Sequence, residues 1–162
     1  MKTIIHDLNE NDLKKIKFND KDKVFPALTY QNNCIGCFSC WIKHPKKCIF
    51  KDEFSNITDF LKNSDEFIII SKNRYGCYSG KVKKVLERCI GYVLPYFEIR
   101  NNEIHHQKRY DKNIKLNIYF YGNNSNKELT EKLVRANSIN LGTTNYNITY
   151  INNIKELNKC IR

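Results

Sequence analysis

The sequence contains no long apolar run. Nowhere do the 162 residues approach the roughly 18 consecutive apolar residues that a membrane-spanning helix needs. The opening segment, MKTIIHDLNEND, turns polar and acidic at once and so lacks the apolar core of a secretory signal. We therefore predict a cytoplasmic protein that has no membrane partner.

The sequence also has no segment rich in glycine, proline or serine that could act as a linker between domains. Only six glycines and three prolines are spread along the chain, and there is no internal repeat or low-complexity segment. A length of 162 residues suits one domain with a buried core. We predict a single domain that spans residues 1–162.

The net charge of +11 comes without any nucleic-acid-binding motif. Lysine is scattered over the chain, and the densest basic stretch, Lys81 to Lys84 followed by Arg88, has helical spacing. We interpret the charge as a bias of composition and do not expect a nucleic-acid partner. The basic stretch is expected to form the solvated face of a helix.

The seven cysteines do not have the pattern of a disulfide scaffold, because their number is odd and four of them are clustered. These four lie within fifteen residues, in the run CIGCFSCWIKHPKKC, with the spacing C-x2-C-x2-C-x7-C. Thiolates packed this densely are typical of a metal or iron–sulfur site. We predict a cysteine-rich loop of this kind at residues 34–48.

Three interpretations of Cys34, Cys37, Cys40 and Cys48 stay open. Tight C-x2-C-x2-C runs recur as ligands of iron–sulfur clusters, whereas zinc sites more often pair two C-x2-C knuckles across a longer spacer. Free thiols without a metal are the third interpretation. The spacing favours a [4Fe–4S] cluster, and Trp41 is then expected to shield it from solvent.

Apolar periodicity predicts an alternation of strands and helices. Strands are expected at residues 2–7, 23–30, 66–72, 116–122 and 147–151. Helices are expected at 10–16, 54–62, 81–92, 128–136 and 154–161, and the polar stretch 95–113 is expected to be irregular. This alternation predicts a three-layer α/β fold, with a parallel sheet of about five strands between helices. Pro26 places its own strand at an edge of the sheet or at a bulge.

Ligands of such sheets lie beyond the carboxyl ends of the strands. The cysteine loop follows the second strand, and the segment RYGCYSG follows the third. We therefore expect both segments at this edge. The polar pair His105 and His106, with Arg109 nearby, is interpreted as ordinary surface, because adjacent side chains of an extended chain point to opposite sides.

Residues 34 to about 92 carry a family resemblance. The cysteine run is followed by the acidic pair Asp52-Glu53, a helix, a buried strand, a loop that contains Tyr75 and Gly76, and a helix that ends at Arg88. This succession resembles the flavodoxin-like NADPH-dependent FMN reductases, and among them the iron–sulfur flavoproteins.

The resemblance implies a flavodoxin-like fold and a redox protein in which FMN and a [4Fe–4S] cluster exchange electrons. It also implies NADPH or an electron-transfer protein as the redox partner, and a homo-oligomer. The catalytic residues stay unknown. The residues that the resemblance places at the flavin are Ser71, Asn73, Arg74, Tyr75, Gly76, Tyr78 and Ser79.

One part of the family pattern is missing. Members have a phosphate-binding loop after the first strand, where backbone N–H groups and hydroxyls face the anion. This chain has HDLNEND there, and Asp7, Glu10 and Asp12 would repel a phosphate. A second hypothesis is therefore a non-catalytic subunit or cluster carrier that has lost FMN binding. A zinc-binding module that uses its positive charge on nucleic acid is the third.

Overall fold

A five-stranded parallel sheet forms the centre of the protein. The computed structural model describes residues 1–27, 31–122 and 126–161. All neighbouring strands of the sheet run parallel, in the order β2-β1-β3-β6-β7. The strands are β1 (Lys2–His6), β2 (Lys23–Pro26), β3 (Glu66–Lys72), β6 (Lys115–Tyr121) and β7 (Tyr146–Ile151). This is the strand order of the flavodoxin-like fold, so the predicted fold class is confirmed.

The central strands are apolar on both sides because both faces of the sheet are covered. In β3, Phe67 and Ile69 pack into one core, and Ile68 and Ile70 pack into the other. All four are at most 2% exposed. Continuous apolar runs of this kind are typical of buried parallel strands. Pro26 lies in an edge strand, as its missing N–H group requires.

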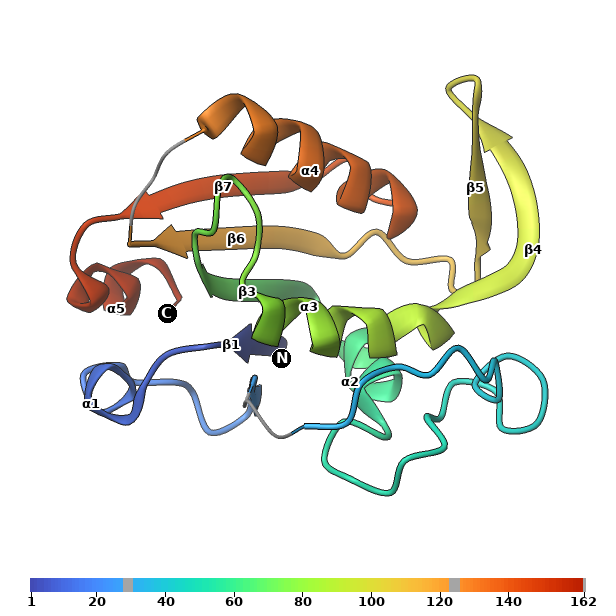
Figure 1. The fold of residues 1–162 in the computed structure, drawn as a ribbon, viewed down its shortest axis with the longest axis horizontal. Helices are drawn as coiled ribbons and strands as arrows, with labels where there is room; N and C mark the ends of the chain where they lie inside the picture. Colours follow the sequence, from blue (N-terminus) through green and yellow to red (C-terminus); the bar gives the residue numbers. More distant parts are fainter. Residues whose placement is uncertain (28–30, 123–125, 162) are drawn as a thin grey trace.

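Helices cover the two faces unequally (Figure 1). The first core lies under α2 (Ile57–Asn63), α3 (Gly80–Glu87) and α4 (Lys127–Asn140). The second lies under the single-turn helices α1 (Glu10–Leu13) and α5 (Leu157–Cys160), with the short 3-10 helix η2 (Ile154–Glu156) beside α5. The predicted helix over residues 81–92 is instead α3 followed by a 3-10 segment, η1 (Arg88–Tyr92).

Capping residues explain where the helices begin and end. Ser79 accepts a hydrogen bond from the backbone N–H of Val82, and Asn126 does the same for Leu129. Gly142, at φ +69°, follows the end of α4, as expected. The predictions of strand at residues 28–30 and of turn at 123–125 lie outside the described residues.

The prediction of an irregular stretch at 95–113 is wrong for most of its length. Strands β4 (Val93–Arg100) and β5 (Glu103–Lys108) form an antiparallel hairpin there, which stands away from the central sheet (Figure 1). Asn101 and Asn102 both have positive φ and form its two-residue turn. All but one of the hairpin residues are half-buried or exposed, and apolar and polar residues do not alternate regularly along its sequence as they do in a strand with one buried face.

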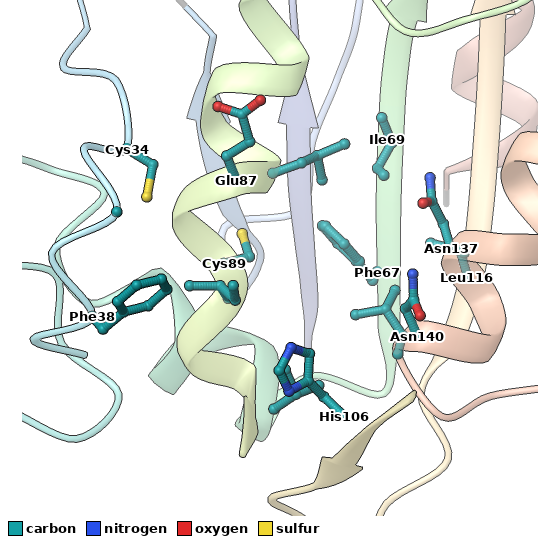
Figure 2. Close-up of a pocket in the computed structure, with 15 residues that line it drawn as sticks. Cys34, Phe38, Phe67, Ile69, Glu87, Cys89, His106, Leu116, Asn137 and Asn140 are labelled. Carbon is teal, nitrogen blue, oxygen red and sulfur yellow. The ribbon is translucent and has the colours of Figure 1, made fainter. Parts of the chain in front are cut away.

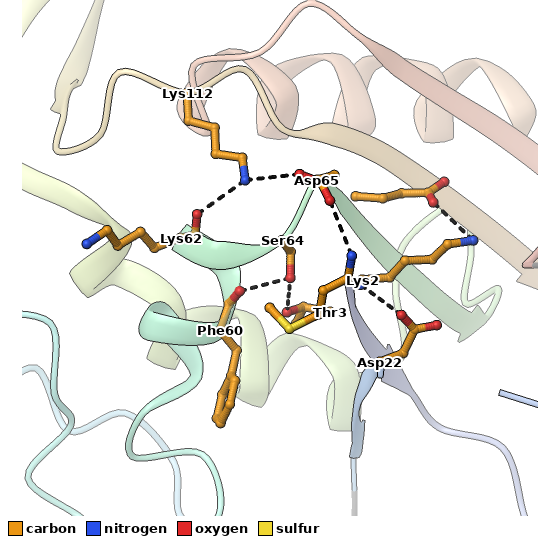
Figure 3. A network of polar contacts seen from close by, with 10 residues as sticks. Lys2, Thr3, Asp22, Phe60, Lys62, Ser64, Asp65 and Lys112 are labelled. Carbon is orange, nitrogen blue, oxygen red and sulfur yellow. Dashed lines mark hydrogen bonds and ion pairs between the residues drawn. The ribbon is translucent and has the colours of Figure 1, made fainter. Parts of the chain in front are cut away.

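A network of polar contacts joins the amino ends of the strands (Figure 3). The Asp65 carboxylate receives the N-terminal ammonium group at 3.2 Å and Lys112 at 3.5 Å. Thr3 and Ser64 share a buried hydrogen bond of 2.7 Å, and Ser64 also donates to the carbonyl of Phe60. Because these polar groups are bonded to one another, their role at this edge of the sheet is structural.

Candidate functional site

The four clustered cysteines line one small cavity. Cys34, Cys37, Cys40 and Cys48 surround a volume of about 40 Å³, together with Arg88 from the end of α3. Cys34 and Cys37 are exposed, whereas Cys40 and Cys48 are half-buried. The fold therefore brings together thiols that are up to fourteen positions apart in the sequence. We call this the cysteine pocket.

The loop that carries these cysteines is anchored to the body of the protein by Trp41. Its indole N–H donates to the carbonyls of Ile90 and Val93, at 3.1 and 3.0 Å. Its ring stacks on Phe38, whose φ of +53° turns the chain. Trp41 does not line the cysteine pocket. Trp41 therefore holds the loop in place. The expectation that it shields the cysteines directly is wrong.

Arg88 is the charged group of the cysteine pocket. Its side chain is 1% exposed, and its two terminal nitrogens donate to both carboxylate oxygens of Asp52, at 2.6 and 2.7 Å. The guanidinium group also lies over the rings of Phe50 and Phe54. The prediction that Arg88 belongs to a solvated face is wrong, because the 3-10 turn that begins at this residue directs it inward.

One donor of Arg88 remains unused. Its Nε–H is buried and has no hydrogen-bond partner among the residues that the structure describes. Burial acts to lower the pKa of Arg88, but interactions with Asp52 and with the Cys48 sulfur outweigh this effect and raise it. The guanidinium is therefore held charged beside the cysteines. An unpaired buried donor of this kind indicates a missing acceptor.

Electrostatics also connects the four thiols. Burial raises the pKa of Cys40, and the neighbouring Cys48, Cys34 and Cys37 raise it further. Nonetheless, in the described part of the chain no three His, Cys, Asp or Glu side chains are arranged to hold a single metal ion. A tetrahedral zinc ion, with Zn–S bonds of about 2.3 Å, would draw its sulfurs to within about 3.8 Å of one another. The cysteines of the described residues do not form such a group.

The loop after β3 carries the residues expected at a flavin. Tyr75 is 85% exposed and projects from the loop with φ +56°. Gly76 also has a positive φ, of +86°, and an added Cβ would lie 2.8 Å from the backbone oxygen of Asn126. Tyr78 is buried and stacks on Phe120, so it is not available to a ligand. Of the two tyrosines that might stack on a ring, the structure leaves only Tyr75 free to do so.

The polar groups of the same loop are mostly bonded to one another. Arg74 and Cys77 exchange two backbone hydrogen bonds of 2.9 Å, and the Asn73 side chain accepts from Gly76. Ser71 accepts from the backbone N–H of Ser79, and Ser79 caps α3. Hence Ser71 and Ser79 are explained by local structure, while the buried amide nitrogen of Asn73 has no partner among the described residues.

The cysteine pocket and this loop do not lie together. Ser79 precedes the first residue of α3, and Arg88 directly follows its last. An eight-residue helix is about 12 Å long, so its length separates the two sites. The expectation that both segments meet at the carboxyl edge of the sheet is wrong. The cysteine loop continues past the end of β2 and packs beside the far end of α3.

Asp7 occupies the position after β1 where a flavodoxin-like protein has its phosphate loop. Its carboxylate accepts the backbone N–H of Lys72, with contacts of 3.0 and 3.2 Å, and its carbonyl accepts from the Tyr121 hydroxyl. The helix that follows, α1, has only four residues. No long helix therefore presents its N-terminus to an anion at this position, and the nearest side chain is itself an anion.

The two neighbouring histidines point in different directions, as expected for extended chain. His105 is bonded to Glu103 and Asn140, whereas the His106 ring packs between Trp41 and Phe97, with centroids 4.9 and 4.6 Å away. The interpretation of both as ordinary surface therefore fails for His106. The signal that was missed is the alternation of β5, which turns one of any two adjacent side chains inward.

Comparisons with known proteins show the fold and nothing finer. No family model matches the chain, and no curated protein does. Among solved structures, the chain is similar to an FMN-dependent NADH-azoreductase from Bacillus anthracis in complex with FMN. The TM-score is 0.50 at 13% sequence identity, over 99% of this chain and 94% of that one.

The helices in the described part of the chain are all too short or too polar to span a membrane.

Proposed function

We propose that this chain is an electron-transfer protein of flavodoxin-like fold that holds a [4Fe–4S] cluster on Cys34, Cys37, Cys40 and Cys48. The observation that carries the proposal is that all four thiols line one pocket beside a buried arginine. A cluster of this type takes one thiolate on each of four irons, so it needs the thiols around a common space and not around one point.

The charge of the pocket suits such a cluster. Four thiolates carry negative charge that burial would make costly without a cation nearby. Arg88 lines the pocket and would place its guanidinium group, which is paired with Asp52, beside such a cluster. Hydrogen bonds to sulfur and exclusion of solvent are the means by which a protein sets a cluster's potential. The cluster would supply one-electron transfer, and this chain's residues would bind it and set that potential.

The outer wall of the pocket consists of loop residues and not of core. Ile35, Phe38 and Ile49 line it and are each about half exposed or more, at 64%, 48% and 51%. Apolar side chains at these positions limit the access of water to the cysteines. Their exposure means that the pocket can widen without disturbing the two cores of the sheet.

The test is to purify the protein without oxygen and measure iron, acid-labile sulfide, zinc and flavin for each chain. The proposal expects iron and sulfide in equal amounts, with a broad visible absorption. Cys37→Ser should lose most of the iron, whereas Cys160→Ser, an exposed cysteine outside the pocket, should keep it. Zinc alone, or no metal after reconstitution, would overturn the proposal.

The second candidate is an FMN-dependent NAD(P)H oxidoreductase, and Tyr75 is the observation that favours it. The tyrosine is exposed beyond the carboxyl end of β3, where flavodoxin-like proteins bind flavin, and the similar azoreductase holds FMN. The phosphate end of FMN does not fit this chain, because Asp7 lies where the phosphate would bind. The flavin measurement decides between the candidates: iron without flavin supports a cluster carrier, and stoichiometric FMN supports the oxidoreductase.

We also propose that the chain forms a homo-oligomer through its hairpin. Four large apolar side chains of the hairpin, Tyr96, Phe97, Ile99 and Ile104, are each more than 60% exposed. Ile99 and Ile104 face one another across the two strands, so their apolar surface is continuous. Contiguous exposed surface of this kind is typical of protein–protein contacts.

A further inference from the structure

A second, larger cavity lies beside the cysteine pocket (Figure 2). Its volume is about 580 Å³, within the range of small-molecule sites. Cys34 and Phe38 of the cysteine loop bound it on one side of the α3 segment, and Asn137 and Asn140 of α4 bound it on the other. The sheet contributes three buried side chains to its lining, Phe67, Ile69 and Leu116.

This cavity is not the strand-end site of the fold. None of the residues that follow β1 or β3 directly, such as Asp7, Tyr75 or Gly76, lines it. It shares four lining residues with the cysteine pocket instead, which are Cys34, Gly36, Phe38 and Ile90. A molecule bound in the cavity would therefore lie against the cysteine loop.

A polar group with no partner lies at one end of the cavity. The Nδ1 atom of His106 is buried and has no hydrogen-bond partner among the described residues. The ring is held between Trp41 and Phe97, so it has little freedom to turn toward water. The imidazole lines the cavity, and with the amides of Asn137 and Asn140 it is among the side chains there that can form a hydrogen bond with a bound molecule.

The charge of the lining excludes phosphorylated ligands. Among the described residues that line the cavity, Glu87 is the one with a charged carboxylate, and none is a lysine or arginine. This is notable in a chain with a net charge of +11. A nucleotide, FMN included, would bring two or more negative charges to a site whose only charge is negative. The rest of the lining is mainly aliphatic and aromatic.

We propose that this cavity binds a neutral, flat aromatic molecule, with its polar end at His106 and its ring against the apolar floor. Binding does not depend on the proposed cluster. A bound molecule would also touch residues that line the cysteine pocket, and this matters for electron transfer only if the proposed cluster is present. The two therefore fail separately: binding is measured with and without iron, and iron is measured with and without the ligand.

The experiment uses two probes with the same ring system, 1-aminoanthracene and anthracene-1-carboxylate. Trp41 is the single tryptophan of the chain, and it contacts two lining residues, Phe38 and His106. Energy transfer from Trp41 to the anthracene ring therefore reports binding to the chain, and the variants below assign that binding to this cavity. The expected result is saturable transfer with one amine probe per chain, and affinity for the carboxylate that is at least about tenfold lower.

Variants test the two polar features separately. His106→Phe keeps the stacked ring and removes the hydrogen-bonding atom, so it should weaken binding of the amine about three- to tenfold. His44→Phe makes the same change at an exposed histidine that lines neither cavity, so it is the matched control and should bind as the wild type does. Glu87→Gln changes an exposed side chain and should narrow the preference for the neutral probe.

Three results would overturn the proposal. The first is equal affinity for the two probes, and the second is unchanged binding by the folded His106→Phe variant. The third is an absence of saturable energy transfer in the full chain, including the case in which a second copy fills the cavity and blocks the probe. Circular dichroism of each variant identifies loss of folding.

Discussion

Removing Asp52 should destabilise the protein more than removing its partner Arg88. The two side chains form one ion pair, but Arg88 is 1% exposed and Asp52 is 26% exposed. Asp52→Asn leaves a buried guanidinium without its counter-charge, which costs about 3–5 kcal/mol. Arg88→Met leaves a carboxylate that water can still reach, and the methionine fills the same apolar space, so the cost should be at most about 2 kcal/mol.

Equilibrium unfolding in urea, followed by Trp41 fluorescence on the reduced, metal-free protein, measures both costs. A domain is typically stable by about 5–15 kcal/mol, so the Asn variant should lose a large part of that stability. The double variant should be close to Arg88→Met alone, because no buried charge is then left unpaired. Trp41 is suited to this measurement because it is anchored to Ile90 and Val93, next to the ion pair.

Acid provides an independent check of the same pair. Partial burial acts to raise the pKa of Asp52, but hydrogen bonds from Arg88 and Asn32 outweigh it and lower the pKa below its ordinary value of 3.8. The contribution of a carboxylate with a lowered pKa is complete above its unfolded value and is lost as pH falls through its folded value. The difference between wild type and Asp52→Asn should therefore shrink in acid. Equal costs for the two single variants, or a larger cost for Arg88→Met, would refute the buried position of Arg88.

Three further predictions concern other parts of the molecule. Burial lowers the pKa of His6 from 6.5 to about 4. The imidazole is therefore protonated at a higher pH in the unfolded chain than in the folded one, and the free energy of unfolding should fall by up to about 3 kcal/mol as pH drops from 6.5 to 4. In urea unfolding measured across this pH range, His6→Phe should remove this fall. Gly76→Ala should lower the thermal midpoint more than Gly36→Ala, because both have positive φ but only Gly76 lies against backbone, at Asn126. Ile99→Lys should shift sedimentation toward a smaller species while circular dichroism shows a folded chain, and an unchanged sedimentation profile would contradict the hairpin contact.

The fold could be predicted because its strongest signals are local. The runs EFIIISK and KLNIYFY are apolar on both sides and became the central strands β3 and β6. Ser79 and Gly142 marked helix ends through their own capping chemistry. The hairpin was missed for the opposite reason: it has little buried surface, and its one local signal, the Asn101-Asn102 turn, is short.

The candidate sites depend on contacts that no local pattern contains. Arg88 has the spacing of a surface residue, and only the 3-10 turn after α3 buries it against Asp52, which is 36 positions away. The second cavity joins residues from Cys34 to Leu141, so six separate segments must pack before it exists. Of the two candidate sites, only the cysteine pocket could be predicted from the sequence, through the spacing of its cysteines.

At the carboxyl edge of the sheet, where this fold usually binds its ligand, the residue after β1 is bonded to two other strands of the sheet. Asp7 accepts a hydrogen bond from the N–H of Lys72, the last residue of β3, and its carbonyl accepts one from the hydroxyl of Tyr121, the last residue of β6. Each of these bonds uses a group that a phosphate would otherwise need. Two of the unpaired buried polar groups, Arg88 Nε and His106 Nδ1, belong to residues that line the cysteine pocket and the cavity next to it, and a third, the amide nitrogen of Asn73, lies in the loop after β3. Because unpaired buried groups are costly unless a ligand satisfies them, the chemistry of this chain is best sought beyond the far end of α3.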